Sequence, residues 1–361
     1  MADLNEIVTL KIAGQAFTGW TEISVSRGLN ALCSAFSLTV VDTAPGQTDR
    51  SAITDQAACQ LWIGADLVIT GYIDHIDGDI AGDTLTVTGR DKTADLVDCS
   101  AVHPTGSWVN AGLATIAGDL IKPFALALKI ESPTGARFAN FCLEPGEAVA
   151  EALFRLTQMR GLMLTTSAAG ELVIFSPSSS RPKIPGFEVG RNIKGGRLSS
   201  SSAERFSTYL VRGQHRGGDL VSAKDATRPK GQAADVGVLR YRPLVIVSHE
   251  QATPAGLESR ARFEATSRLG KAQSAEITVA GWRDDAGGLL VPNVIARLNS
   301  AARGFDDDMM IADVQLKLDG NGTTAGLRMV RPQAYTTEAI LEPKVKHKKK
   351  RGGYNIEALR D

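Results

Sequence analysis

The chain has 361 residues, with 40 basic and 40 acidic side chains and a formal net charge of zero. Its length predicts about two to four domains rather than one core. A content of 43% hydrophobic and 22% charged residues is ordinary for a globular protein. No apolar run approaches the roughly 18 residues that a membrane-spanning helix needs, and the N-terminus has no pattern of a secretory signal.

Charge and cysteines are unevenly distributed. The segment Lys344–Arg351 holds six of the forty lysine and arginine residues and no acid, which leaves a body of net charge −6 and a basic tail. The four cysteines are widely spaced and form no C-x-x-C pair. We therefore expect buried thiols rather than a disulfide framework. They are Cys33, Cys59, Cys99 and Cys142.

Residues 1–103 have the pattern of an all-β domain. Short segments alternate apolar and polar side chains, the period-2 signature of half-buried strands, and turn residues separate them. Six or seven such strands argue for a small barrel or sandwich, and we assign a first β-barrel domain. The expected strands are 7–13, 15–18, 20–27, 36–40, 57–63, 67–76 and 83–89.

Residues 104–178 change to an α/β pattern. Apolar residues at helical spacing predict helices over 108–124 and 147–160. Lys122-Pro123 ends the first helix, and Gly161 is a C-cap candidate for the second. Segments 126–131, 162–166 and 171–175 predict strands. We expect an α/β insert domain here.

Residues 179–204 are rich in Ser, Pro, Gly and Arg, and predict a connector. Residues 205–335 then predict a second β-barrel domain with one helix, and 336–361 form the basic C-terminal tail. Leu244-Val245-Ile246-Val247 predicts a strand buried on both faces, and Asp319-Gly320-Asn321-Gly322 is a strong hairpin signal. The fold class is therefore α+β, with two β-barrel domains and an inserted α/β module.

A family resemblance begins in residues 71–99, which combine a hairpin, a break and a short helix. Gly71-Tyr72-Ile73-Asp74 and Gly89-Arg90-Asp91-Lys92-Thr93-Ala94-Asp95-Leu96-Val97-Asp98-Cys99 resemble the baseplate hub protein of Mu-like contractile-tailed phages. The similarity continues in the same order over nearly the whole chain. More distantly, this family is similar to the T-even phage hub and to the hub region of type VI secretion spikes. The further matching stretches are Phe17-Thr18-Gly19-Trp20-Thr21, Ala168-Ala169-Gly170-Glu171-Leu172-Val173 and Arg240-Tyr241-Arg242-Pro243-Leu244-Val245-Ile246.

The resemblance implies a structural hub that assembles as a homotrimer. Two similar barrels in each of three subunits would place six alike units around one axis. This ring would adapt a hexameric tail tube to a trimeric central spike and leave a channel through which DNA passes without sequence-specific binding. The resemblance further implies a place in the virion baseplate, assembly in the host cytoplasm, and contacts with other baseplate proteins. Gly19-Trp20 and Gly281-Trp282 hint that the two barrels are related.

No catalytic, cofactor-binding or metal-binding residue is predicted. The five histidines form no H-E-x-x-H and no metal-ligand spacing with cysteine. An acidic run in residues 74–83 lacks the twelfth-position glutamate of an EF-hand, and Asp306-Asp307-Asp308 predicts a polar loop. We expect Arg90 and Lys92 to pair with nearby carboxylates. The histidines are His75, His103, His215, His249 and His347.

Other functions remain open from the residues alone. One is a tail-associated protein that binds or cleaves carbohydrate or peptidoglycan, which would need paired carboxylates in an aromatic-lined cleft. The segment Lys344–Arg351 is compatible with a solvated end, with electrostatic binding of nucleic acid, or with a contact to a partner protein. Truncation after Glu342 separates these three interpretations.

Overall fold

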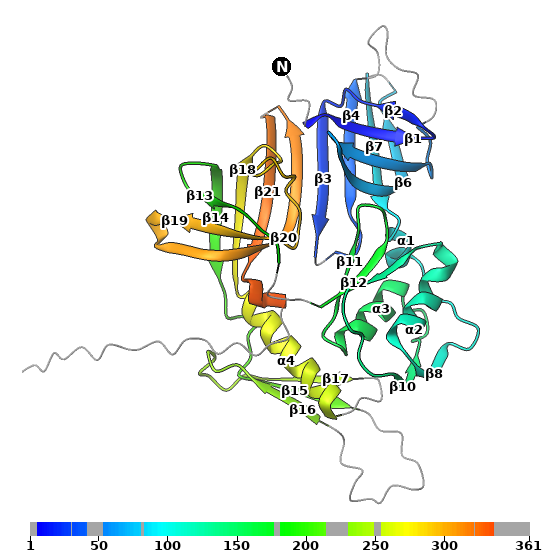
Figure 1. Cartoon of the computed structure of the whole chain (residues 1–361), viewed down its shortest axis with the longest axis vertical. Coiled ribbons are helices and arrows are strands. Elements are labelled where there is room, and N and C mark those ends of the chain that lie inside the picture. The colour runs from blue at the N-terminus through cyan, green and yellow to red at the C-terminus, as the bar shows by residue number, and fades with distance from the viewer. Residues whose placement is uncertain are drawn as a thin grey trace, which may run out of the picture.

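The computed structural model describes residues 6–29, 31–41, 53–80, 83–176, 181–213, 230–248, 254–320 and 322–335. The described residues are mostly β, with a smaller mixed α/β part below the strands in the view of Figure 1. The basic tail 336–361, together with His215 and His249, lies outside the described residues. No helix among the described residues is long and apolar enough to cross a membrane.

The N-terminal strands form one half of a large sheet. They are paired in the order β3, β4, β7, β6, β5, β1, β2, with antiparallel neighbours throughout. The alternation in the sequence predicted them well. They are β1 (Val8–Ile12), β2 (Gln15–Phe17), β3 (Glu22–Gly28), β4 (Ala35–Val41), β5 (Ala58–Ile63), β6 (Asp66–Gly78) and β7 (Thr84–Asp91).

The other half of this sheet comes from the C-terminal part of the chain. It contains β13 (Lys183–Glu188), β14 (Ile193–Ser200), β18 (Gln273–Ala280), β19 (Ile295–Ser300), β20 (Phe305–Asp319) and β21 (Gly322–Val330). Antiparallel pairing of β20 with β3 joins the two halves into one 13-stranded sheet (Figure 1). The predicted hairpin around 319–322 is confirmed, since β20 and β21 pair up to Asp319 and Gly322.

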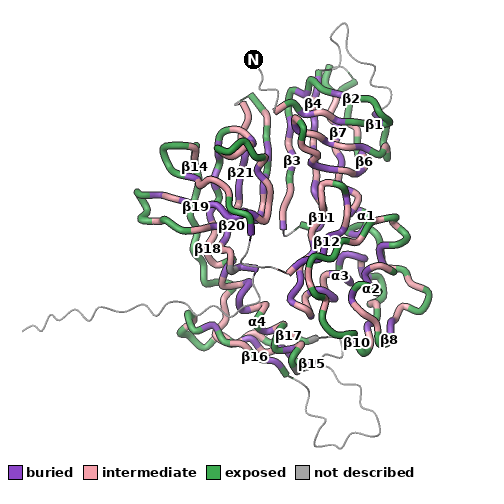
Figure 2. Tube along the Cα trace, viewed as in Figure 1, coloured by how far each residue is buried: buried purple, intermediate pink, exposed green. Residues whose placement is uncertain are grey.

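One apolar core extends across the join. Alternate side chains of β3 and β20, such as Val25 and Leu316, are buried in the same cluster as those of the outer strands. Figure 2 shows buried and more exposed positions alternating along these strands. Among the described residues no set of strand pairings closes into a ring, so the two barrels stay a prediction.

The mixed α/β part follows β7 directly. Strands β11 and β12 form the predicted hairpin, and β9 pairs in parallel with β12. The first long helix ends at Ile121, before Pro123, as the sequence predicts. The elements are α1 (Ala94–Asp98), β8 (Ser107–Ala111), α2 (Leu113–Ile121), η2 (Lys122–Phe124), β9 (Leu128–Ile130), β10 (Phe138–Cys142), α3 (Val149–Gln158), β11 (Met163–Thr166) and β12 (Leu172–Phe175).

A separate three-stranded sheet lies beside this part. Its strands are ordered β16, β15, β17, and helix α4 covers one face of it. Its inner side chains, including Tyr209 and Val211, share a core with α2 and α3. Residues 205–265 therefore pack with the α/β part rather than with the second half of the large sheet, which differs from our expectation. The elements are β15 (Thr208–Gly213), β16 (Lys230–Ala234), β17 (Pro243–Ser248) and α4 (Pro254–Lys271).

The passage 179–204, expected to be a connector, instead contributes two strands to the large sheet. β13 pairs in parallel with β19, and β14 pairs with β18. Nearly all of β14 is exposed, because it lies at an edge and presents few apolar side chains. The apolar alternation that marks a half-buried strand is therefore missing from its sequence.

The four cysteines are all free thiols. Only Cys59 is buried, whereas Cys33 is partly buried and Cys99 and Cys142 are exposed. The expectation that all four are buried is therefore wrong for the last two. Cys99 directly follows α1, and Cys142 is the last residue of β10. Both of these short elements lie at the surface of the α/β part, so the two thiols are not covered by core residues.

Candidate functional surface

One face of the large sheet is polar along its central strands. Every second side chain there packs into the core, so the intervening ones face the other side. Strand pairing aligns these intervening residues in rows that cross the join between β3 and β20. We call this surface the polar sheet face. One row is Thr88, Ser37, Ser24, Lys317 and Thr324, and another is Ala35, Ser26, Gln315, Gly326 and Thr278.

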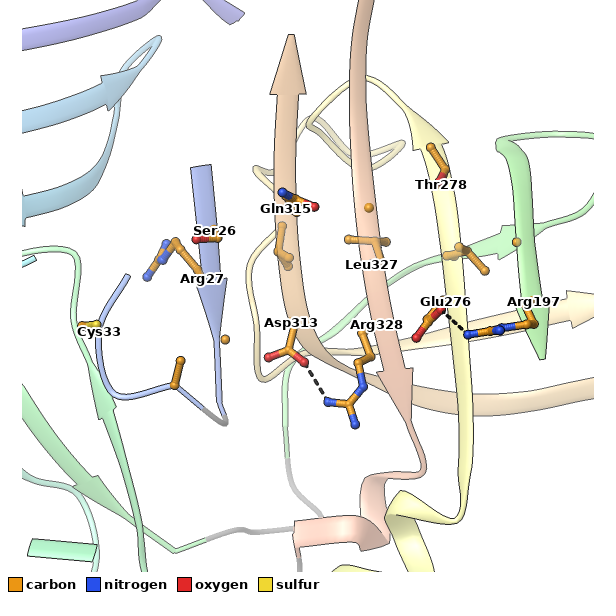
Figure 3. A pocket seen from close by; sticks show the side chains of 16 residues that line it. Ser26, Arg27, Cys33, Arg197, Glu276, Thr278, Asp313, Gln315, Leu327 and Arg328 are labelled. Atoms are coloured by element: carbon orange, nitrogen blue, oxygen red, sulfur yellow. Dashed lines mark hydrogen bonds and ion pairs between the residues drawn. The ribbon is translucent and has the colours of Figure 1, made fainter. Parts of the chain in front are cut away.

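The polar sheet face is hollowed beside the β3–β20 join (Figure 3). This groove has a volume of about 690 Å³ and is lined mainly by β3, β14, β18, β20 and β21. Gly28 in β3 pairs with Asp313 in β20, and a Cβ on Gly28 would lie 2.1 Å from Asp313 Oδ1. A Cβ on Gly196 would lie 2.6 Å from the backbone oxygen of Glu276. Glycine at position 28 therefore leaves room for the Asp313 side chain, and glycine at position 196 lets β14 approach β18.

The charged side chains in the groove form two ion pairs. Arg328 Nη1 donates to Asp313 Oδ2 at 2.8 Å, and Arg197 Nη2 donates to Glu276 Oε2 at 3.0 Å (Figure 3). The remaining cation, Arg27, points away from the row that contains Ser26 (Figure 3), and burial lowers the pKa of its guanidinium. Both carboxylates of the groove are thus paired with an arginine, and Arg27 adds one further cation to its lining.

A second, smaller hollow of about 180 Å³ lies on the same face. It is lined by hydroxyl groups such as those of Ser37 and Thr39, and by Lys317 together with Glu22 and Asp319. The Thr39 and Thr86 hydroxyls are 3.1 Å apart and hydrogen-bonded. Over both hollows the polar sheet face is therefore rich in hydroxyl and amide groups and has no excess of positive charge.

The groove does not have the composition of a glycosidase site. It contains the carboxylates Glu276 and Asp313, but each is bound to an arginine. None of the 16 residues that line it is aromatic. A sugar-cleaving pair needs one carboxyl group free to donate a proton and a surface on which the sugar ring stacks.

The motif that carries the family resemblance is a structural joint. Asp91 is buried at the end of β7, where its Oδ2 accepts the backbone N–H of Ser34 at 2.6 Å and its Oδ1 accepts that of Thr93 at 2.9 Å. Burial raises the pKa of Asp91, and the hydrogen bonds from Thr93 and Ser34 oppose this. The carboxylate thereby ties the start of α1 to the segment before β4.

Arg90 reinforces the same joint from the surface. Its Nε donates to Asp74 Oδ2 at 2.5 Å, and its Nη2 donates to Asp98 Oδ2 at 2.7 Å. The prediction of carboxylate partners is therefore confirmed for Arg90. Lys92 forms no ion pair within the described residues and instead lies beside Gly170, the turn of the β11–β12 hairpin.

Three consecutive aspartates form ion pairs along a strand. Asp306, Asp307 and Asp308 lie in β20, not in the expected loop, and pair with Arg297, Arg331 and Lys183. In the described part of the chain, no three His, Cys, Asp or Glu side chains are arranged to hold a metal ion. His103 stacks on Trp108 with ring centroids 4.2 Å apart.

Sequence reasoning named no residue of the polar sheet face. The alternation in 20–27 did predict that Ser24 and Ser26 face away from the core. Only the long-range pairing of β3 with β20 brings them beside Lys317 and Gln315, and no local pattern encodes that pairing.

Comparison with known families covers most of the chain. Residues 7–91 match the family described as "Mu phage baseplate assembly protein GpP-like, N-terminal". Residues 93–176 match "Baseplate hub protein gp44-like, second domain", and residues 205–263 match "Tail protein NMB1110-like, third domain". Residues 253–338 match "Mu phage baseplate assembly protein GpP, fourth domain".

Individual relatives agree with these matches. The baseplate hub protein gp44 of Escherichia phage Mu is 34% identical over 97% of this chain and 93% of its own. The 43 kDa tail protein of prophage MuSo2 from Shewanella oneidensis is 34% identical, with a TM-score of 0.76 over 91% of this chain and 99% of its own. A tail protein from Neisseria meningitidis MC58 is 22% identical and shares the fold, with a TM-score of 0.77 over 92% of this chain and 98% of its own. The chain therefore belongs to the family of Mu-like phage baseplate hub proteins.

Proposed function

We propose that this chain is a structural subunit of a contractile-tail baseplate and forms a homotrimeric ring. Each subunit would supply two related barrel-like strand sets, one on each side of the β3–β20 join. Both sets contain a glycine with positive φ followed by a tryptophan buried in the same core. These are Gly19 (φ 82°) with Trp20, and Gly281 (φ 72°) with Trp282. The repeated local structure supports a common origin of the two sets.

We retain the domain division as part of this proposal. The first barrel would span 1–103, the insert 104–178 and the second barrel 205–335. Residues 179–204 would link the insert to the second barrel while also supplying β13 and β14, and 336–361 would be the tail. Family matches that end at residues 91 and 176 and begin again at residue 205 support boundaries near these positions. The insert also shares a buried core with residues of 205–265, through α2, α3 and α4.

Three such subunits would give a ring with six alike units around one axis. Closed cyclic symmetry makes a ring self-limiting, since each subunit uses the same two surfaces. A ring of this kind would adapt a hexameric tail tube on one side to a trimeric central spike on the other. Its place would be the virion baseplate, after assembly in the host cytoplasm, and its role would be structural rather than enzymatic.

The observation that carries the proposal of a channel is the polar sheet face. It crosses both strand sets without a break, and its charged groups, such as Asp313 with Arg328, are balanced. DNA that must slide through a channel needs a hydrated wall without strong phosphate binding, because each phosphate contact adds affinity. We therefore infer that this face lines the channel.

The mass of the purified full chain tests the ring. Light scattering over a dilution series is expected to give a stable species near three times 38.3 kDa. The same measurement is then made after co-expression with the spike protein of the same tail. A chain that stays monomeric both alone and with the spike would overturn the proposal.

Charge substitutions test the channel. Ser26→Lys with Gln315→Lys places two cations side by side in one row of the polar sheet face. We expect particles assembled with this variant to release their DNA more slowly than particles with the parent chain. This delay should shorten as the salt concentration is raised. Ser26→Asn with Gln315→Asn is the matched control. Unchanged DNA release in the lysine variant would exclude this face as the channel wall.

A further inference from the structure

The three-stranded sheet has one face against α4 and one face open. On the inner face, Tyr209 and Val211 are fully buried, and a Cβ on Gly231 would lie 2.2 Å from the Leu257 carbonyl carbon. This close approach fixes α4 on that side. No described residue covers the other face as closely as α4 covers the inner one. On that other face Val245 and Val247 of β17 are 47% and 48% exposed.

Strand register defines the open face. Val245 pairs with Leu210, and Val247 pairs with Arg212, which also pairs with Lys230. Side chains in one row across a sheet point to the same side. The open face therefore has an apolar centre, Leu210 with Val245 and Val247, and a basic end, Arg212 with Lys230. We call this the open sheet face.

The sequence of β17 does not fit a half-exposed strand. Four consecutive apolar residues, Leu244 to Val247, are typical of a strand covered on both sides. The composition of β17 thus indicates a second layer over the open sheet face.

The loop that joins β16 to β17, at the end of the sheet opposite Arg212 and Lys230, also has exposed apolar side chains. Val236, Leu239 and Tyr241 are 65%, 96% and 89% exposed. Together with Val245 and Val247 they account for five of the fourteen large apolar side chains that are exposed among the described residues. A concentration of this kind marks a protein–protein contact.

The basic end defines the chemistry of the partner. Arg212 and Lys230 lie directly opposite each other on antiparallel strands, where like charges are unfavourable. Both are exposed, and neither forms an ion pair within the described residues. Carboxylates on a partner would relieve this repulsion.

We propose that the open sheet face docks another protein of the baseplate, through an apolar surface that has carboxylates at one end, placed over Arg212 and Lys230. A second copy of this chain offers a poorer match. The nine other exposed large apolar side chains are spread along the sequence from Ile7 to Leu198 and do not form a second stretch of this size.

Zero-length cross-linking in purified tails tests the partner. A water-soluble carbodiimide joins the Lys230 amine to a carboxyl group in contact with it, with loss of water, and the joined peptides are identified by mass spectrometry. We expect Lys230 to be joined to an aspartate or glutamate of another baseplate protein. A cross-link to a carboxyl group of this chain, or none to any protein, overturns the proposal. Lys230→Gln, which has no amine, is the control for assignment.

Hydroxyl-radical footprinting probes the open sheet face and the β16–β17 loop independently. Oxidation of Leu239, Tyr241 and Val245 is compared between the isolated full chain and intact tails. We expect it to fall about threefold or more on assembly, as for side chains that leave solvent. Equal oxidation in both states would show that the face stays open and would overturn the proposal.

A substitution tests the contribution of the apolar centre. Val245→Asn buries an amide without a partner, so the yield of assembled tails is expected to fall about tenfold. Val245→Ile keeps an apolar, β-branched side chain and should assemble normally. The melting temperature of each isolated variant is measured first, because only variants that fold like the parent chain are informative. Normal assembly of a folded Val245→Asn variant would overturn the proposal.

Discussion

Gly270 of α4 lies against Ala334 of the short helix η4 (Pro332–Tyr335) so closely that a Cβ on Gly270 would come within 1.8 Å of the Ala334 Cα. Ala334 and Tyr335 are buried, with exposed fractions of 0% and 2%. Since η4 follows β21 directly, this contact fixes the end of the large sheet on the helix that covers the three-stranded sheet. The two sheets are thereby held in one arrangement.

We expect Gly270→Ala to destabilise the protein by about 1–3 kcal/mol, the usual range for overpacking a close contact. The nearest atoms are the Cα, Cβ and backbone nitrogen of Ala334, none of which can rotate away, so the helices must separate for a methyl group to fit. Chemical denaturation measures the change. Gly118, in the interior of α2, has no neighbouring atom within 4 Å of a built Cβ. Gly118→Ala should therefore stabilise by about 0.5–1 kcal/mol, and a loss of stability of equal size in both variants would contradict the proposed contact.

Replacing Arg90 by lysine should lower the stability of the fold. Its guanidinium donates to Asp74 and to both carboxylate oxygens of Asp98, which a single ammonium group cannot reproduce. Because these side chains are partly exposed, we expect Arg90→Lys to cost only about 0.5–1 kcal/mol. Urea denaturation measures the effect. A double mutant with Asp98→Asn should show less than the sum of the two single losses, whereas strict additivity would indicate that the pair does not interact.

The same pair predicts a pH dependence. Hydrogen bonding to Arg90 lowers the pKa of Asp98. The folded state then binds this proton less readily than the unfolded state, so the pair stabilises the fold above the unfolded pKa and loses its effect as pH falls through the folded pKa. The stability difference between the parent chain and Arg90→Lys should shrink as the solution is acidified below about pH 4. A difference that stays constant down to pH 2 would contradict this explanation.

Cys59 should be the least reactive thiol in the described part of the chain. Burial chiefly raises its pKa to about 12, and the charge of Asp74 adds to the effect. At pH 8, alkylation followed by peptide mapping should label Cys99 and Cys142 first, since the thiolate is the reactive form. The unfolded thiol ionises near pH 8.5, so Cys59 contributes stability that is complete below that pH and is lost as pH rises towards 12. Cys59→Ala should show a weaker loss over this interval.

Replacing Trp282 by phenylalanine should lower the stability of the fold. Its ring is fully buried, and Nε1 donates to the backbone oxygens of Lys317 and Thr324 at 3.0 and 3.1 Å. Trp282→Phe leaves these oxygens without the donor and creates a small void, so we expect a loss of about 2–4 kcal/mol. Trp62 is only partly buried, and Lys11 lies 4.2 Å from its ring centroid. Trp62→Phe should cost about 1 kcal/mol or less, and thermal denaturation compares the two.

The sequence predicted elements whose own side chains alternate or carry strong turn residues. The β20–β21 hairpin and the end of α2 before Pro123 are of this kind. β14 was missed because an exposed edge strand needs no apolar side chains. In β17 the four apolar residues correctly predicted a strand, but burial on both faces is not achieved within the described chain.

The polar sheet face could be predicted only in part. Ser24 and Ser26 were on the outward side of an expected strand, but their location beside Lys317 and Gln315 depends on pairing between the two ends of the chain. The packing of residues 205–265 against the α/β part could not be predicted for a related reason. Tyr209 and Val211 are ordinary strand residues, and which core they enter is decided by α4 and its contact through Gly231.

The pairing of Ile23 with Leu318 has a consequence for synthesis of the chain. β3 is translated near the beginning of the chain and β20 near its end. The edge of β3 therefore has no partner strand until nearly all of the intervening residues have emerged from the ribosome. Contacts between such distant segments form slowly, and an unpaired strand edge attracts other chains meanwhile. Truncated products that lack β20 should therefore aggregate rather than accumulate as a folded N-terminal fragment.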